Sequence, residues 1–206
     1  MNNRRNLVIK RWFDVTMSLW GLFVFTPLFL VVSLLVKSTS KGSVFYIAPR
    51  VGQYGKMFNL YKFRTMFVGA DKEAEGSITV DGDRRITPIG RILRKTKIDE
   101  LPSLLNVLKG DMSFVGPRPD VKGYADSLTG NDRLILNLKP GITGPATLKY
   151  ANEENLLANV SDPVRYNNEV IFPDKVRINL SYLDSINLFT DLKLIFKTIF
   201  GHFLVF

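Results

Sequence analysis

The sequence predicts a mainly helical α+β protein, with an N-terminal apolar membrane helix followed by a small domain that contains a β-hairpin and amphipathic interfacial helices. No charged residue occurs from Val15 to Val36, strand-like segments flank a Gly-rich turn, and leucines then recur at helical spacing. The length of 206 residues fits one domain. We therefore expect the membrane helix and its basic flanks in residues 1–40, and a membrane-associated domain in residues 41–206.

The charge balance indicates an anionic partner. The formal net charge is +9, which suits a nucleic acid, an acidic membrane surface or a phosphorylated substrate. Nucleic acid is disfavoured because the aromatic residues concentrate in the apolar segments and are not interleaved with the basic ones. The chain has no cysteine, which excludes disulfides and cysteine-ligated metals.

The apolar segment Val15–Val36 is long enough to cross a bilayer. As a helix it measures about 33 Å, against a hydrocarbon core of about 30 Å. It is too long for the apolar region of a signal peptide. A buried core helix is the other reading, but such helices rarely run this far without a charge.

The residues in and around this segment do not decide between a helix that spans the membrane and one that enters and leaves by the same face. Thr26-Pro27 lies midway, where a proline kinks a helix and the Thr26 hydroxyl can bond a freed carbonyl. A simple span prefers basic residues on its cytoplasmic side only, whereas a segment that enters and leaves by one face is basic on both sides. Lys10, Arg11 and Lys37 are then expected at one interface, near anionic lipids. The complete set of flanking basic residues is Arg4, Arg5, Lys10, Arg11, Lys37, Lys41 and Arg50.

The rest of the chain is expected to be short elements. Ser43–Ile47 and Phe58–Tyr61, either side of Gly52-Gln53-Tyr54-Gly55, predict a hairpin. Asp71–Asp83 has the composition of a loop, and Ile89–Leu93 begins a short helix. Leu101, Leu104, Leu105 and Leu108 predict a helix that Gly110 ends. Ile186–Phe206 fits either a helix at the membrane interface or a core helix.

Asp99-Glu100 is the most suggestive pair of carboxylates. It precedes the leucine helix, with Pro102 in the first turn, and Thr96-x-x-Asp99 has the form of a capping box. An acidic helix cap is therefore one interpretation. The other is a catalytic pair, which requires the helix end itself to face the site.

Basic residues near this pair favour a site. Arg94 precedes it, Arg118 follows within Gly116-Pro117-Arg118-Pro119, and Lys62 and Arg64 lie in Lys62-Phe63-Arg64-Thr65-Met66. Arginine forks bind phosphate oxygens and a carboxylate holds a divalent metal, so the set is typical of a diphosphate site. The single histidine, His202, lies in the apolar tail, which disfavours histidine-based catalysis.

These motifs together resemble the bacterial sugar transferases, in the minimal form of the monotopic phosphoglycosyl transferases. The resemblance covers almost the whole chain, in order. The matching segments are Lys10-Arg11-x-x-Asp14, Lys62–Met66, Asp99-Glu100-Leu101-Pro102, the unbroken run Asn106–Pro119, Pro140-Gly141-Ile142-Thr143-Gly144 and Asp191-Leu192-Lys193.

The resemblance implies a re-entrant helix broken at Thr26-Pro27, on the cytoplasmic face of the bacterial inner membrane. It implies that Asp99 attacks the sugar-linked phosphorus of a UDP-sugar and releases UMP, after which the phosphosugar passes to undecaprenyl phosphate. Glu100 is then a partner acid/base or orienting group, Arg94 and Arg118 bind phosphate, and Mg²⁺ is the cofactor, contacted by Asp99. The reaction is then the first membrane step of glycan assembly. A homodimer is compatible with the resemblance.

Two departures from the family pattern concern the sugar. Many members continue the Gly144 motif as Gly-Trp-Ala-Gln-Val, whereas this chain has Pro145–Tyr150, and Asn179 stands where an acidic residue is common. A non-catalytic membrane scaffold is the alternative function. The intact Asp99, Glu100 and Arg118 argue against it, because a scaffold does not need them.

Overall fold

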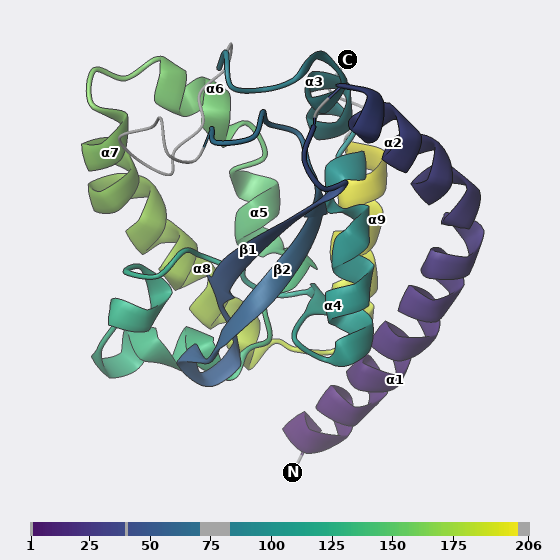
Figure 1. Ribbon diagram of the computed structural model, residues 1–206. Coiled ribbons are helices and arrows are strands. Elements are labelled where there is room, and N and C mark those ends of the chain that lie inside the picture. Colours follow the sequence, from purple (N-terminus) through teal and green to yellow (C-terminus); the bar gives the residue numbers. More distant parts are fainter. Residues whose placement is uncertain (1, 40, 71–82, 202–206) are drawn as a thin grey trace.

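The computed structural model describes residues 2–39, 41–70 and 83–201, and it is mainly helical with two small sheets. A bent pair of N-terminal helices runs along one side of the molecule, next to α4, and the β1–β2 hairpin lies between α4 and α8 in the view of Figure 1. The helices are α1 (Asn2–Val24), α2 (Thr26–Thr39), α3 (Pro88–Lys95), α4 (Leu104–Lys109), α5 (Pro145–Lys149), α6 (Glu153–Ala158), α7 (Pro163–Tyr166), α8 (Phe172–Asp184) and α9 (Leu188–Gly201). The strands are β1 (Phe45–Val51), β2 (Met57–Phe63), β3 (Ser113–Val115) and β4 (Gly141–Thr143).

The predicted break in the N-terminal segment is confirmed. α1 and α2 meet at Phe25 with a bend of 62°. Pro27 offers no N–H to the preceding turn, and the Thr26 hydroxyl donates to the Leu22 carbonyl at 2.7 Å. By length and composition, no single helix among the described residues passes as a membrane span, whereas the bent pair Arg5–Val24 with Thr26–Thr39 passes together.

Two of the basic residues before the apolar segment, Lys10 and Arg11, are bound by other parts of the protein. Lys10 is 7% exposed, and its ammonium pairs with Asp191 of α9. The Arg11 guanidinium donates to the Val107 and Leu108 carbonyls at 2.6 and 2.8 Å. The expectation that these two residues attract anionic lipids is therefore wrong, because both charges are satisfied inside the protein. Lys37 is exposed.

The predicted hairpin is confirmed, with longer strands than the sequence indicated. β1 and β2 pair antiparallel, from Phe45 opposite Phe63 to Val51 opposite Met57. The predicted turn holds a short 3-10 segment, Gln53–Gly55, in which Tyr54 and Gly55 have positive φ. Beneath the hairpin, Phe63 packs with Val32 and Val36 of α2 and Leu93 of α3, which joins the bent pair to the domain.

The segment around Asp99 differs from its prediction. The 3-10 helix Ile98–Ser103 precedes α4, so the expected helix from Leu101 is divided in two. The capping-box interpretation is wrong: the Thr96 hydroxyl donates back to the Ile92 carbonyl at 2.8 Å, and Thr96 ends α3. Gly110 ends α4 as predicted, with φ 95°.

A parallel two-stranded sheet is one of the elements that the sequence did not predict, as are α5, α6, α7 and α8. β3 and β4 pair through Ser113–Gly141 and Val115–Thr143. Their ends approach closely, since a Cβ on Gly116 would stand 2.2 Å from the Lys139 carbonyl oxygen. Only glycine fits there. Strands of three residues carry no alternating pattern, and prolines on both sides mask them.

The C-terminal helix α9 occupies part of the predicted segment Ile186–Phe206. Asp191 faces inward at 1% exposure, while Phe189, Phe196 and Ile199 are at least half exposed. The helix thus has polar contacts inside, from Asp191 and from Thr198 to the Thr143 hydroxyl at 2.6 Å, and an apolar face outside. The predicted loop Asp71–Asp83 lies, except for Asp83, outside the described residues.

Candidate active site

The candidate site is built around Glu100, which lies in the 3-10 helix before α4. Its Oε1 accepts one hydrogen bond from Lys62 Nζ and one from Arg118 Nη2, both at 2.8 Å. Three residues that are far apart in the sequence, and that were predicted as site residues, are thereby brought together.

Local structure explains how these groups meet. Lys62 lies on β2, and Arg118 follows β3 between two prolines that fix φ. The Asn106 amide of α4 completes the edge of β2, accepting from Tyr61 N at 3.0 Å and donating to the Asn59 carbonyl at 2.7 Å. Because the Asn106 side chain is fully buried, these bonds fix α4, and the 3-10 turn before it, against the hairpin.

The contacts among Lys62, Glu100 and Arg118 favour the charged form of Glu100 and of Arg118. Burial alone would raise the pKa of Glu100, but the charges of Arg118 and Lys62 outweigh it and hold that pKa well below its usual range. Glu100 in turn raises the pKa of Arg118. Burial lowers the pKa of Lys62, and Glu100 opposes this shift. Glu100 is therefore an ionised anchor for two cations near neutral pH, and a weak proton acceptor.

Asp99 is the exception in this charged region. It is 8% exposed, and within the part of the chain that the structure describes its buried Oδ1 has no hydrogen-bond partner. Burial raises its pKa, the Glu100 charge adds to this, and Lys62, Lys97 and Arg94 oppose it. A buried carboxylate oxygen without a partner is costly for stability and is poised to react or to bind a cation.

The two remaining predicted phosphate binders lie differently. Arg94 Nη2 donates to Glu154 of α6 at 2.7 Å, and its charge still reaches Asp99. Arg64 donates to the Ser43 carbonyl and hydroxyl at 2.8 and 2.9 Å, where it secures the entry to β1. We therefore leave Arg64 out of the proposed site.

Asp120 is a residue of this region that sequence reasoning missed. Burial raises its pKa to about 6, against the charges of Lys175 and Arg118. Its place directly after Arg118-Pro119 was the available signal. The Asp120 carboxylate is partly buried, and its charge interacts with that of Arg118.

A cleft of about 520 Å³ opens over α5 and α6. Lys149 and Tyr150, which belong to the departure from the family pattern, line it together with Asn152 and Glu153. Glu153 also binds Lys175 at 2.7 Å, and its charge contributes to the raised pKa of Arg118.

The residues around Asp99 fit only one mode of magnesium binding, in which the protein supplies few of the ligands. The described residues contain no group of three or more carboxylates, histidines and cysteines that forms a protein cage for a metal. Mg²⁺ commonly keeps its waters and is held by one or two carboxylates plus substrate phosphates. The unpartnered Oδ1 of Asp99 fits that mode.

A buried carboxylate oxygen without a partner near fixed cations, in a domain attached to a bent apolar helix pair, is an arrangement suited to an enzyme that acts on a phosphate-bearing substrate. A family model narrows this class: the model described as "Bacterial sugar transferase" matches residues 5–204. The chain belongs to this family and is a transferase.

Relatives of two lengths match the chain. It is 35% identical to "Exopolysaccharide production protein ExoY" of Rhizobium meliloti, over 92% of this chain and 83% of the relative. It is 33% identical to "UDP-N-acetylgalactosamine-undecaprenyl-phosphate N-acetylgalactosaminephosphotransferase" of Aeromonas hydrophila, over 93% of this chain and 43% of that protein. It is 35% identical to "UDP-glucose:undecaprenyl-phosphate glucose-1-phosphate transferase" of Klebsiella pneumoniae, over 98% of this chain and 42% of that protein. The chain thus spans less than half of these last two relatives.

Proposed function

We propose that this chain moves a sugar-1-phosphate from a UDP-sugar to undecaprenyl phosphate, as the first membrane step of glycan assembly. The observation that carries the proposal is the buried, unpartnered Asp99 oxygen beside the Lys62–Glu100–Arg118 cluster. The names of the relatives from Aeromonas hydrophila and Klebsiella pneumoniae support the donor and acceptor classes.

The reaction has two steps. An Asp99 carboxylate oxygen attacks the phosphorus that bears the sugar, and the bond from that phosphorus to the bridging oxygen breaks, so UMP leaves. An acyl phosphate of Asp99 remains. An oxygen of the lipid phosphate then attacks the same phosphorus, the bond to Asp99 breaks, and the carboxylate is restored.

Cations make the first step feasible, because a carboxylate and a diphosphate repel each other. Arg118 and Lys62 are held in place before the donor arrives, so stabilising the developing charge needs little reorganisation. Arg94 adds a further positive charge that acts on Asp99. Mg²⁺ held by Asp99 and the donor phosphates would neutralise phosphate charge. The low pKa of Glu100 favours an orienting role over proton transfer.

We further propose that α1 and α2 enter and leave the membrane by the cytoplasmic face. The bend of 62° and the exposed apolar residues of both helices support this arrangement. α9 would then lie at the interface, with Phe196 and Ile199 towards lipid. Such placement lets one site meet a water-soluble donor and a lipid acceptor in turn.

A screen for UMP release tests the proposed reaction. The protein is incubated with Mg²⁺, undecaprenyl phosphate and single members of a panel of UDP-sugars. One or a few donors should release UMP in proportion to the sugar that becomes lipid-linked. Release of free sugar phosphate or of UDP would contradict the bond assignment, and no release from any donor would favour the scaffold alternative.

Replacing Arg118 with alanine should lower activity far more than stability. A charge-assisted contact to a phosphate is typically worth about 2–5 kcal/mol, so we expect the turnover to fall about 10²-fold or more. Because Arg118 is 45% exposed, the free energy of unfolding should fall by about 1 kcal/mol. Arg165→Ala, which removes an exposed arginine from a pair with Glu169, is the matched control. A rate that merely follows the folded fraction would contradict the role.

The path of the helix pair can be tested with single cysteines, since the chain has none. Arg5→Cys and Lys41→Cys lie on opposite sides of the apolar segment, and neither should react with a membrane-impermeant thiol reagent in intact cells. Both should react after permeabilisation. In a Pro27→Ala background, which favours a straight helix, position 5 should label in a fraction of molecules. Labelling of position 5 from outside in the unaltered background would show an ordinary span.

A further inference from the structure

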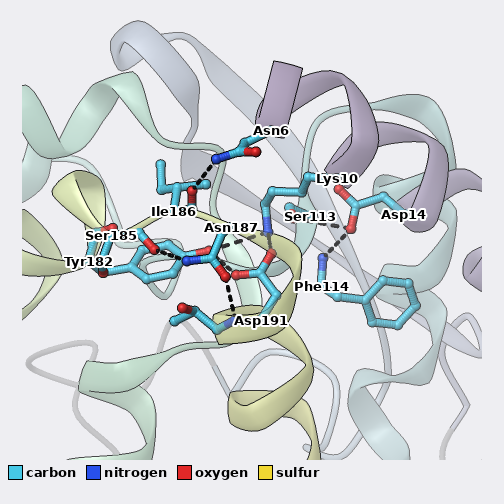
Figure 2. A network of polar contacts seen from close by, with 11 residues as sticks. Asn6, Lys10, Asp14, Ser113, Phe114, Tyr182, Ser185, Ile186, Asn187 and Asp191 are labelled. Carbon is cyan, nitrogen blue, oxygen red and sulfur yellow. Dashed lines mark hydrogen bonds and ion pairs between the residues drawn. The ribbon is translucent and has the colours of Figure 1, made fainter. Parts of the chain in front are cut away.

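Lys10, Arg11 and Asp14 of α1 each bind a different element of the domain (Figure 2 shows the contacts of Lys10 and Asp14). Lys10 and Asp14 are one turn apart and both are buried, at 7% and 2% exposure. The proposed reaction uses none of the three. Lys10 contacts α8 and α9, Arg11 contacts α4, and Asp14 contacts β3.

Lys10 ties α1 to the C-terminal part of the chain. Its ammonium pairs with Asp191 Oδ2 and lies 3.4 Å from the Tyr182 hydroxyl, which itself donates to Asp191 Oδ1 at 2.5 Å. Burial and the Asp191 charge raise the pKa of Tyr182, so the hydroxyl keeps its proton. One turn earlier, the Asn6 amide donates to the Ile186 carbonyl at 3.1 Å.

Arg11 ties α1 to the helix that follows the catalytic turn. Its guanidinium caps the last carbonyls of α4, those of Val107 and Leu108. At the other end of α4, Gly21 approaches so closely that a Cβ there would stand 3.2 Å from Leu104 Cδ1. α1 therefore contacts both ends of α4, whose first residue directly follows the turn that carries Asp99.

Asp14 ties α1 to the strand that leads to Arg118. Its Oδ1 accepts from Phe114 N at 3.0 Å and from the Ser113 hydroxyl at 3.2 Å, both in β3. The two sides of the site, the carboxylate pair and Arg118, are thus attached to one helix. That helix also carries the first part of the exposed apolar segment, which continues through the bend into α2.

The site also has bonds of its own that do not involve α1. Asn106 joins α4 to β2, and Glu100 joins Lys62 to Arg118. The mutual geometry of the catalytic groups therefore has separate support. What the contacts of Lys10, Arg11 and Asp14 add is the position of this whole assembly along α1.

We propose that Lys10, Arg11 and Asp14, with Asp191 and Tyr182, are positioning residues that set the distance of Asp99 from the bilayer. The inference rests on the proposed function. The donor is soluble and reaches Asp99 at any height, whereas the depth of the acceptor phosphate is fixed by the membrane. An error of about 1 Å in the reacting geometry costs about 10²-fold in rate. The network therefore governs the lipid step and not the donor step.

Two variants separate this role from folding. In Lys10→Met/Asp191→Leu both charges leave together, because replacing a whole buried ion pair by apolar residues is often neutral for stability. Arg11→Met, which keeps the stem and removes the cap of α4, is the second and independent variant. The matched control is Arg165→Met/Glu169→Leu, which removes an exposed ion pair.

Each step is measured on full-length protein in nanodiscs. Formation of the phosphosugar adduct is followed by mass spectrometry with the UDP-sugar alone. Transfer from the adduct is followed with undecaprenyl phosphate in the bilayer, and with a short, water-soluble prenyl phosphate. In both variants we expect adduct formation within about threefold of the parent. Transfer to the bilayer acceptor should fall at least about tenfold, and transfer to the soluble acceptor should change little.

The outcomes distinguish this proposal from the proposed function. Equal losses in both steps, or equal losses with both acceptors, would show that the network only supports the fold and would overturn the inference. Unchanged transfer in both variants would overturn it as well. Absence of any adduct in the parent protein would instead contradict the covalent mechanism itself.

Discussion

Asp99→Asn should abolish transfer and leave the protein at least as stable as the parent. The amide is no anionic nucleophile, so we expect the rate to fall by at least about 10⁴-fold. Stability should not fall, because the ionised carboxylate is buried with an unpartnered oxygen and its pKa is raised. Turnover with donor, Mg²⁺ and acceptor checks the first part, and thermal unfolding measured without donor or metal checks the second.

The pH dependence of stability in Asp99→Asn shows whether the ionised Asp99 carboxylate destabilises the folded protein. The folded parent holds the Asp99 proton at pH values where the unfolded chain has lost it, so the free energy of unfolding falls as pH rises through the raised pKa. The Asn variant lacks this loss, so its stability relative to the parent should increase as pH rises from the ordinary pKa of an aspartate through the raised pKa of Asp99. Adduct formation by the parent should decline as pH falls through the same raised pKa.

Asp184→Asn is the control for this prediction, because Asp184 is an exposed carboxylate at the end of α8. It should change neither rate nor stability. An Asp99→Asn variant that transfers sugar phosphate at the parental rate would remove Asp99 from the reaction.

Glu100→Gln should have the second largest effect, and on both activity and stability. The change leaves Lys62 and Arg118 without their shared anion. Breaking a buried ion pair costs about 3–5 kcal/mol, and the 45% exposure of Arg118 reduces this to about 2–3 kcal/mol of unfolding free energy. The turnover should fall by about 10²-fold or more, because the two cations are no longer held at the donor phosphates.

The shape of the pH profile separates the two roles of Glu100. A residue that only orients cations should leave the pH profile of the remaining activity unchanged in Glu100→Gln. Loss of one limb of the profile would show proton transfer by Glu100 and contradict the orienting role. Glu169→Gln, which alters an exposed ion pair, is the control for the change of charge.

Three features of the fold were predictable because their signals are local. The bend at Thr26-Pro27, the hairpin around Gly52–Gly55 and the end of α4 at Gly110 each depend on residues a few positions apart. The grouping of Lys62, Glu100 and Arg118 in one site was also predicted, from the chemistry of basic residues and carboxylates at a diphosphate site and not from the spacing of the three residues.

The partners of Lys10 and Arg11 of α1 could not be predicted from neighbouring residues in the sequence. Beside an apolar segment, Lys10 and Arg11 read as lipid-facing charges, and only tertiary structure shows Asp191 and the end of α4 as their partners. Residues 10 and 191 are far apart in the sequence, and neither has a pattern that reveals the other. The predicted capping box at Thr96-x-x-Asp99 failed because the backbone turns at Lys97, with φ 56°, so Thr96 is not the N-cap of the next helix.

The central claim is that Asp99 carries the phosphosugar between donor and lipid. Mass spectrometry of the protein mixed with Mg²⁺ and an accepted UDP-sugar, without lipid, tests it most directly. We expect a mass increase of one sugar phosphate, located on the peptide that contains Asp99, with one UMP released per adduct and the adduct lost when undecaprenyl phosphate is added. An adduct on another residue, or full transfer with the protein never modified, would contradict the claim.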